Sequence, residues 1–187
     1  MKRIGPTRTS ETDPMRIDFI RPAEGWGLIG MSFCPGKKQL NSRSGHWDRD
    51  LDADLSRIQE WGTGMVVSLI ETHEFAALQV IDLPETVSQM GMSWRHLPIR
   101  DRCPPSSEFN LRWQTLAPEI LTTLAAGKNV FLHCMGGLGR TGLVAACILI
   151  ESGLDQKEAI KKVRKARPKT IETALQELYV LNYRSTI

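Results

Sequence analysis

The chain has 187 residues, of which 41% are hydrophobic and 24% charged, and its formal net charge is +3. This size and composition are typical of one globular domain with a core of its own. So small a charge excess gives no reason to expect nucleic-acid or membrane binding, and no apolar stretch reaches the roughly 18 residues of a membrane span.

Residues 1–16 are polar, contain prolines and lack the apolar core of a secretory signal, so we expect a flexible tail there and one domain over residues 17–187. The four cysteines are scattered, with no C-x-x-C pair and no metal-ligand spacing. Because a chain of this size needs no disulfide framework, we expect a reducing compartment, the cytoplasm.

The first half of the domain begins with an expected strand at residues 27–33, followed by a polar loop at 35–47. Helix signals begin near Asp50, with apolar side chains on one face, and the glycine at Gly62 ends the helix. A short apolar run at 65–69 has the character of a buried strand. The alternation of strand and helix favours an α/β domain.

After the apolar run at 65–69 we expect a helix at residues 83–90 and a strand at 93–99. Ser106 or Ser107 is placed to cap a long helix with one apolar stripe. Pro118 should kink or divide this helix, because proline lacks the N–H that an interior helical position donates.

The last third begins with a buried strand at residues 129–133, followed after a glycine-rich turn by an apolar helix at 141–152. Asp155 and Glu158 have the spacing of a capping box, which predicts another helix. An amphipathic helix over residues 171–183 is expected to end the domain.

The glycine-rich turn carries the most information, and it reads C-M-G-G-L-G-R-T-G from Cys134. Its three glycines let the backbone curl and aim several N–H groups at one point, and the helix after it adds the positive end of its dipole. Such a turn is a cradle for a tetrahedral dianion. The expected phosphate-binding positions are Met135, Gly136, Gly137, Leu138, Gly139 and Arg140.

A cysteine at the mouth of this cradle is in the same positive field, which stabilises a thiolate, so Cys134 is the expected nucleophile. Arg140 offers a planar fork that binds two phosphate oxygens at once. Thr141 is placed to offer its hydroxyl to the sulfur, and His133 to anchor the loop through its ring. The segment is not a Walker A loop, since Arg-Thr-Gly stands where that motif has Gly-Lys-Ser/Thr.

The ten residues from His133 to Gly142 match the signature H-C-x-x-G-x-G-R-[ST]-G of the protein-tyrosine phosphatase superfamily at every position. The chain length, P-G-K-K in the early loop and H-L-P-I-R-D upstream resemble the dual-specificity and kinase-associated phosphatases in particular. The likeness covers roughly residues 27–184. It implies one α/β phosphatase domain with a central, mostly parallel sheet flanked by helices.

This resemblance implies a general acid on a loop upstream of the signature, and Asp101 is the matching residue. A poor leaving group must be protonated as it departs, which a general acid does, and the same carboxylate can later activate water. Asp82 and Glu85 are competing carboxylates, but both precede the expected strand. Near the C-terminus Gln176 and Glu172 match the segment that places the hydrolytic water, although tyrosine-specific members have Gln where Glu172 stands.

The expected function is hydrolysis of phosphotyrosine, phosphoserine or phosphothreonine on proteins through a cysteinyl-phosphate intermediate. The expected partner is a phosphorylated protein, not nucleic acid or a membrane, and no metal or organic cofactor is expected. Two alternatives stay open: a catalytically weak phosphoprotein-binding module of the same fold, and a phosphatase for a non-protein phosphate ester.

The basic side chains of the early loop either meet an acidic or phosphorylated partner or form a solvated surface, which is the more common case; they are Lys37, Lys38, Arg43 and Arg49. Among the remaining cysteines, Cys103 could act as a resolving thiol for an oxidised Cys134. Cys147 is expected to pack in the core.

Overall fold

Five strands form a central sheet in the computed structural model, which describes residues 6–42 and 45–186. In spatial order they are β1 (Asp18–Ile20), β2 (Ile29–Ser32), β7 (Asn129–His133), β5 (Thr63–Ser68) and β6 (Ser93–His96). Four of them run parallel and β1 pairs antiparallel with β2 at the edge. The expected α/β fold with a mostly parallel sheet is therefore confirmed.

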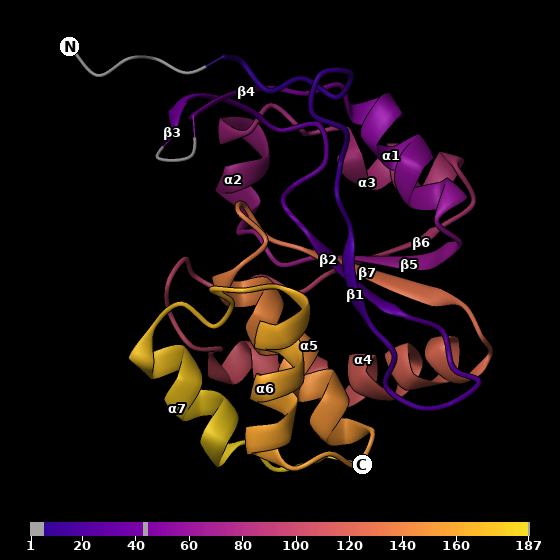
Figure 1. Cartoon of the computed structure of the whole chain (residues 1–187), viewed down its shortest axis with the longest axis vertical. Coiled ribbons are helices and arrows are strands. Elements are labelled where there is room, and N and C mark those ends of the chain that lie inside the picture. The colour runs from indigo at the N-terminus through magenta and orange to yellow at the C-terminus, as the bar shows by residue number, and fades with distance from the viewer. Residues whose placement is uncertain (1–5, 43–44, 187) are drawn as a thin grey trace.

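Helices cover both faces of this sheet (Figure 1). On one side lie α1 (Leu51–Glu60), α2 (Thr72–Ala77) and α3 (Leu83–Gln89), and on the other α4 (Ser107–Ala125), α5 (Gly139–Glu151), α6 (Gln156–Ala166) and α7 (Ala174–Asn182). Sheets covered on both faces need apolar strands, which is why β7 reads as a continuous apolar run. Every residue of α5 is buried, because the sheet and three other helices surround it.

Two helix-capping residues predicted from the sequence cap their helices in the structure. Ser106 caps α4, accepting a hydrogen bond from the amide of Phe109, and Asp155 caps α6 in the same way. Pro118 lies inside α4, which continues through it, so of the two expected effects division was wrong and a kink stays a prediction. The last helix begins at Ala174 rather than at Ile171, which has a φ of 57° and so cannot be helical.

The early polar segment was expected to be a loop, and this was wrong. It forms a hairpin of β3 (Lys38–Ser42) and β4 (Gly45–Asp48) beside the main sheet. Arg43, one of the four basic residues singled out there, lies outside the described residues. The sequence did not predict β1, α2 or this hairpin, because short elements show little periodicity in their apolar residues.

Two of the basic residues are not solvated. Lys37 and Arg49 are both buried, and Arg49 makes a bidentate ion pair with the buried Asp54, at 2.7 and 2.8 Å. The same guanidinium donates to the backbone carbonyls of Thr9 and Asp13. Lys38, by contrast, is exposed, which agrees with the solvated surface considered for these residues.

The described part of the expected tail is packed rather than free. Arg8 forms a backbone bridge with Trp47 and lies 4.9 Å from the centre of its ring. Met15 belongs to the hydrophobic core. Residues 8–15 are thus tied to the domain by Arg49, Trp47 and the core. No helix among the residues described here is long and apolar enough to span a membrane.

The Arg49–Asp54 pair predicts a stability change. Replacing Asp54 by Ala leaves a buried, unpaired guanidinium, so we expect the free energy of unfolding to fall by about 3–5 kcal/mol. Urea denaturation followed by circular dichroism measures it. Lys161→Ala removes a solvent-exposed ion pair and should cost less than about 0.5 kcal/mol. A comparable loss in both variants would contradict the assignment.

Candidate active site

The C-terminal ends of β2, β7, β5 and β6 meet at one edge of the sheet, with their last residues in register. Loops that follow parallel strands converge at that edge, where α/β proteins bind ligands. The converging segments are residues 33–37, 69–74, 97–101 and 134–140. The last of these joins β7 to α5 and approaches α2 (Figure 1).

The cysteine loop has the curled form that its glycines predict. Cys134 is buried at the end of β7, and the amide of Gly137 donates to its sulfur at 3.2 Å. Gly137 has a φ of 71°, in the left-handed region that favours glycine. Helix α5 begins at Gly139, so its positive end lies at the loop.

Arg140 is held by two carboxylates and a carbonyl. Its guanidinium pairs with Glu74 at 2.6 and 3.0 Å, donates to the carbonyl of Ile99 at 3.2 Å, and lies 3.1 Å from Asp101. Burial alone would lower the pKa of Arg140, but its hydrogen bonds to Glu74 and the neighbouring Cys134 raise it above the usual value. The arginine is therefore a permanent cation beside the cysteine.

Glu74 is a site residue that the sequence reading missed. It is buried on α2 and its carboxylate also accepts the amide of Glu71, completing a capping box. The pattern E-x-x-E, which begins at Glu71 shortly after the end of β5, was the available signal, but it marks a helix start and does not predict a contact with Arg140.

His133 supports the loop from behind. The indole of Trp94 donates to the hydroxyl of Ser68, which leaves that hydroxyl free to donate to Nε2 of His133 at 2.7 Å. The Nδ1 hydrogen then faces the carbonyl of Cys134 at 3.4 Å. Burial lowers the pKa of His133 to about 3, so the ring is neutral at physiological pH. It touches the loop backbone, as expected.

Asp101 lies on the loop after β6 with 57% of its side chain exposed, yet within reach of Arg140. It lines an open depression of about 520 Å³ together with Met135, Gly136 and Leu138 of the cysteine loop. The competing carboxylates are elsewhere. Asp82 and Glu85 belong to the start of α3, where Glu85 accepts a hydrogen bond from Gln89.

Glu172 lines the same depression, and its carboxylate accepts the amide of Gly139 at 2.8 Å. Gln176 does not point there. It is buried, its side-chain oxygen accepts the amides of Glu172 and Thr173, and its nitrogen donates to the carbonyl of Cys103. Gln176 therefore joins the Glu172 segment to the loop that carries Asp101.

Two cations that the sequence did not assign hold the outer side of the loop. Arg167 donates to the carbonyls of Gly136 and Gly137, and Lys37 donates to that of Met135 at 3.2 Å. A loop whose amides point inward turns its carbonyls outward, where they need donors. Lys37 stacks at 3.8 Å over the ring of Trp47.

The remaining candidates have simpler surroundings. The hydroxyl of Thr141 is buried and has no hydrogen-bond partner among the described residues, so its bond to the sulfur stays a prediction. All four cysteines are free thiols, and Cys147 is in the core as expected. Cys34 is also buried, and its amide donates to the carbonyl of Met135. The part of the chain that the structure describes holds no cluster of metal ligands.

Comparison with known proteins agrees with this geometry. A family model described as Tc-R-P, polymorphic toxin system, DSP-PTPase phosphatase, matches residues 46–154. Cyclin-dependent kinase inhibitor 3 of Rattus norvegicus is 28% identical over 163 residues, which are 86% of this chain and 73% of the relative.

Two solved structures resemble the fold. A kinase associated phosphatase with its catalytic-site cysteine replaced by serine has a TM-score of 0.77 at 24% identity, over 89% of this chain and 92% of that one. Tk-PTP in the active form has a TM-score of 0.61 at 29% identity, over 82% and 90%.

Fold, loop and relatives together define a cysteine-based protein phosphatase of the tyrosine and dual-specificity class. Within that class, the chain belongs to the polymorphic toxin system DSP-PTPase phosphatase family. The superfamily inferred from the signature is confirmed.

The loop conformation predicts unequal effects at adjacent glycines. A Cβ at Gly137 would lie 2.2 Å from the carbonyl oxygen of Ser32 and would require a positive φ, whereas one at Gly136 would meet nothing within 4 Å. We expect Gly137→Ala to lower the free energy of unfolding by about 2 kcal/mol or more and Gly136→Ala by less than about 1 kcal/mol. Denaturant melts measure both; equal losses would contradict this loop geometry.

Proposed function

We propose that the chain dephosphorylates phosphoproteins by a two-step reaction at Cys134. In the first step the thiolate attacks phosphorus, an S–P bond forms and the P–O bond to the protein substrate breaks. Asp101 gives its proton to the leaving oxygen, without which a phenolate or alkoxide leaves poorly. The products of this step are the dephosphorylated hydroxyl and a cysteinyl-phosphate.

In the second step water attacks the same phosphorus and the S–P bond breaks. Asp101, now a carboxylate, takes a proton from the water, and Cys134 leaves as a thiolate. Glu172 and Gln176 are the proposed residues for the water, with Glu172 in the depression and Gln176 supporting its segment. Inorganic phosphate is released.

Charge on the equatorial oxygens is stabilised in both steps by Arg140 and by the amides of the loop from Met135 onward, except that of Gly139, which already donates to Glu172. Donors that are already in position before the reaction need no reorganisation when charge develops, which is the source of their catalytic effect. Arg140 is prepared in this way because Glu74 fixes one edge of its guanidinium. Thr141 is the proposed hydroxyl donor to the leaving thiolate.

The observation that carries the proposal is the shared position of Asp101, Arg140 and Cys134. The acid candidate lies 3.1 Å from Arg140, which is the neighbour of the buried cysteine, although the sequence separates Asp101 from the loop. The first step requires a proton donor near the phosphate that the nucleophile attacks, and Arg140 is the contact that links Asp101 to the cysteine loop.

The proposed substrates are phosphorylated proteins, and the names of the similar proteins favour a phosphorylated protein kinase among them. A reducing compartment such as the cytoplasm suits this chemistry, because the nucleophile must remain a free thiolate.

Activity on a small aryl phosphate tests the residue roles. We expect Cys134→Ser to lower kcat by at least about 10⁴-fold, since the nucleophile is lost, and Asp101→Asn by about 10²–10⁴-fold, since the leaving group loses its acid. Asp82→Asn is the matched carboxylate control and should stay within about twofold of the wild type.

Three outcomes would reject parts of this proposal. A wild type with no vanadate-sensitive activity would leave the phosphoprotein-binding module as the better reading. Full activity in Cys134→Ser would remove the cysteine mechanism. Hydrolysis of phosphoinositides with no turnover of phosphopeptides would move the substrate class to non-protein phosphate esters.

A further inference from the structure

The turn that carries the proposed acid has an unfavourable backbone conformation. The amide of Cys103 donates to the carbonyl of Arg100 at 3.1 Å, which closes a four-residue turn with Asp101 and Arg102 at its centre. Arg102 has a φ of 59°, in the left-handed region that favours glycine. An arginine is strained there, so the turn needs contacts from elsewhere in the chain to keep this shape.

The ion pair between Asp101 and Arg140 does not supply this support during the reaction. Asp101 must be protonated to act as an acid, and a neutral carboxyl forms no ion pair. The fork of Arg140 is then needed for the phosphate oxygens. Asp101 also has little packing around it, since 57% of its side chain is exposed. Support that lasts through the first step therefore comes from contacts to the backbone of the turn.

The start of α7 makes two such contacts. The hydroxyl of Thr173 donates to the carbonyl of Arg102 at 3.2 Å, and the side-chain nitrogen of Gln176 donates to the carbonyl of Cys103 at 3.4 Å. These carbonyls belong to the two residues that follow Asp101. A hydroxyl has one hydrogen to donate and two lone pairs that accept, so Thr173 also caps its helix by accepting the amide of Gln176 at 3.2 Å.

The chain that leads into α7 is itself fixed against α5, the helix that follows the cysteine loop. A Cβ at Gly142 would lie 2.5 Å from the side chain of Thr170. One at Gly139 would lie 2.7 Å from Glu172, to which the amide of Gly139 donates at 2.8 Å. Two glycines thus let this segment approach α5 closely, and Thr173 reaches the turn from a support that is joined to the cysteine loop.

We propose that Thr173, the N-cap of α7, is a positioning residue for the general acid: its hydroxyl holds the carbonyl of Arg102 and so keeps Asp101 directed at the leaving oxygen. The inference rests on the proposed function and adds to it a residue that acts through another one. Because Asp101 is needed most by poor leaving groups, loss of the Thr173 hydroxyl slows their departure much more than that of good ones.

The test compares two aryl phosphates that differ in the leaving group. The phenol released from para-nitrophenyl phosphate is acidic and needs little protonation, whereas that from phenyl phosphate needs the acid. We expect the ratio of their kcat/KM values, para-nitrophenyl over phenyl, to rise by about tenfold in Thr173→Val, which loses the hydroxyl and nearly keeps the shape. Asp101→Asn sets the upper limit of this ratio. Thr173→Ser retains the hydroxyl and should keep the wild-type ratio.

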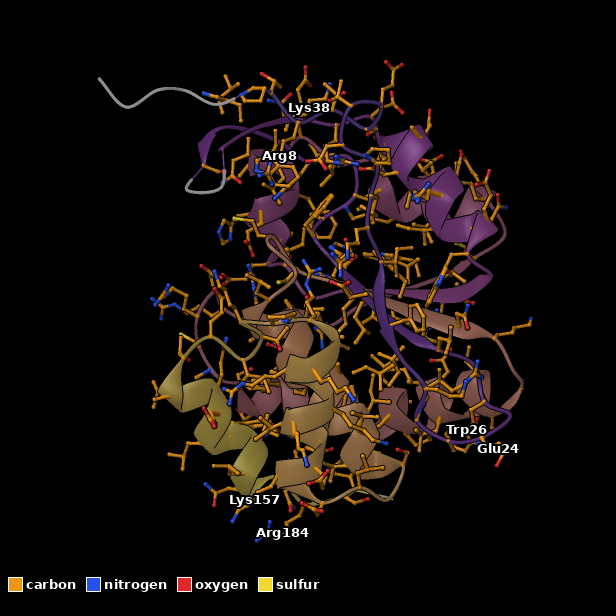
Figure 2. The ribbon with its side chains drawn as sticks, viewed as in Figure 1. Arg8, Glu24, Trp26, Lys38, Lys157 and Arg184 are labelled. Atoms are coloured by element: carbon orange, nitrogen blue, oxygen red, sulfur yellow. The ribbon has the colours of Figure 1, made fainter. Side chains whose placement is uncertain are left out.

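Asp155→Ala is the matched control, because it also removes a helix N-cap and should keep the wild-type ratio. Asp155 accepts the amide of Lys157, which lies near the lower end of the molecule (Figure 2). The segment that leads to Thr173 begins at the other end of α6. An equal rise of the ratio in Asp155→Ala and Thr173→Val would show a general loss of stability and would overturn the inference.

Hydrogen exchange gives a second measurement that does not depend on turnover. The amide of Cys103 closes the turn, so we expect it to exchange about tenfold faster in Thr173→Val than in the wild type. Thr173→Ser and Asp155→Ala should exchange at the wild-type rate. This result supports the positioning role even if the wild type hydrolyses neither aryl phosphate, an outcome that would reject only the proposed function.

Three results would overturn the inference while leaving the phosphatase function intact. One is a ratio that stays at the wild-type value in Thr173→Val although Asp101→Asn raises it. Another is a ratio that rises as much in Thr173→Ser as in Thr173→Val, since loss of the hydroxyl would then not be the cause. The third is an exchange rate at Cys103 that is the same in Thr173→Val and in the wild type.

Discussion

The buried ion pair between Arg140 and Glu74 is the interaction on which the site depends. It joins the start of α5 to α2, which lies on the other side of the sheet, and it fixes the guanidinium beside Cys134. Burying two charges costs several kcal/mol, which a bidentate pair with further hydrogen bonds offsets. The carbonyl of Ile99 and the carboxylate of Asp101 supply these further contacts. The ion pair thus fixes the cation beside the nucleophile, and that cation contacts the proposed acid.

The loop itself is held from its outer side. The carbonyls of Met135, Gly136 and Gly137 face outward, and they are matched by donors from other parts of the chain: Arg167, Lys37 and the amide of Cys34. Two of these donors are cations, so the scaffold that shapes the loop also adds positive charge around it. The same two side chains line a depression of about 310 Å³ beside the loop. Support of the loop and attraction of anions are therefore properties of the same residues.

The sheet explains why these distant segments meet. The central strand β7 delivers Cys134, while β2, β5 and β6 end at the same edge and deliver the segments that begin near Phe33, Leu69 and Leu97. His133 at the end of β7 is neutral and bonded through Ser68 to Trp94, which ties three adjacent strands together at that edge. The loop therefore starts from a fixed point.

The sequence by itself determined the strand, loop and helix around Cys134, because glycines, an adjacent helix start and a spaced arginine act over neighbouring residues. It also determined the fold class and most of the longer helices, whose apolar periodicity is local. Only the tertiary structure decided that Glu74 pairs with Arg140, 66 residues away, and that Lys37 contacts Met135, 98 residues away. The order of the strands in the sheet sets these contacts. A buried lysine in a polar segment looks like a solvated one until a hairpin folds Trp47 over it.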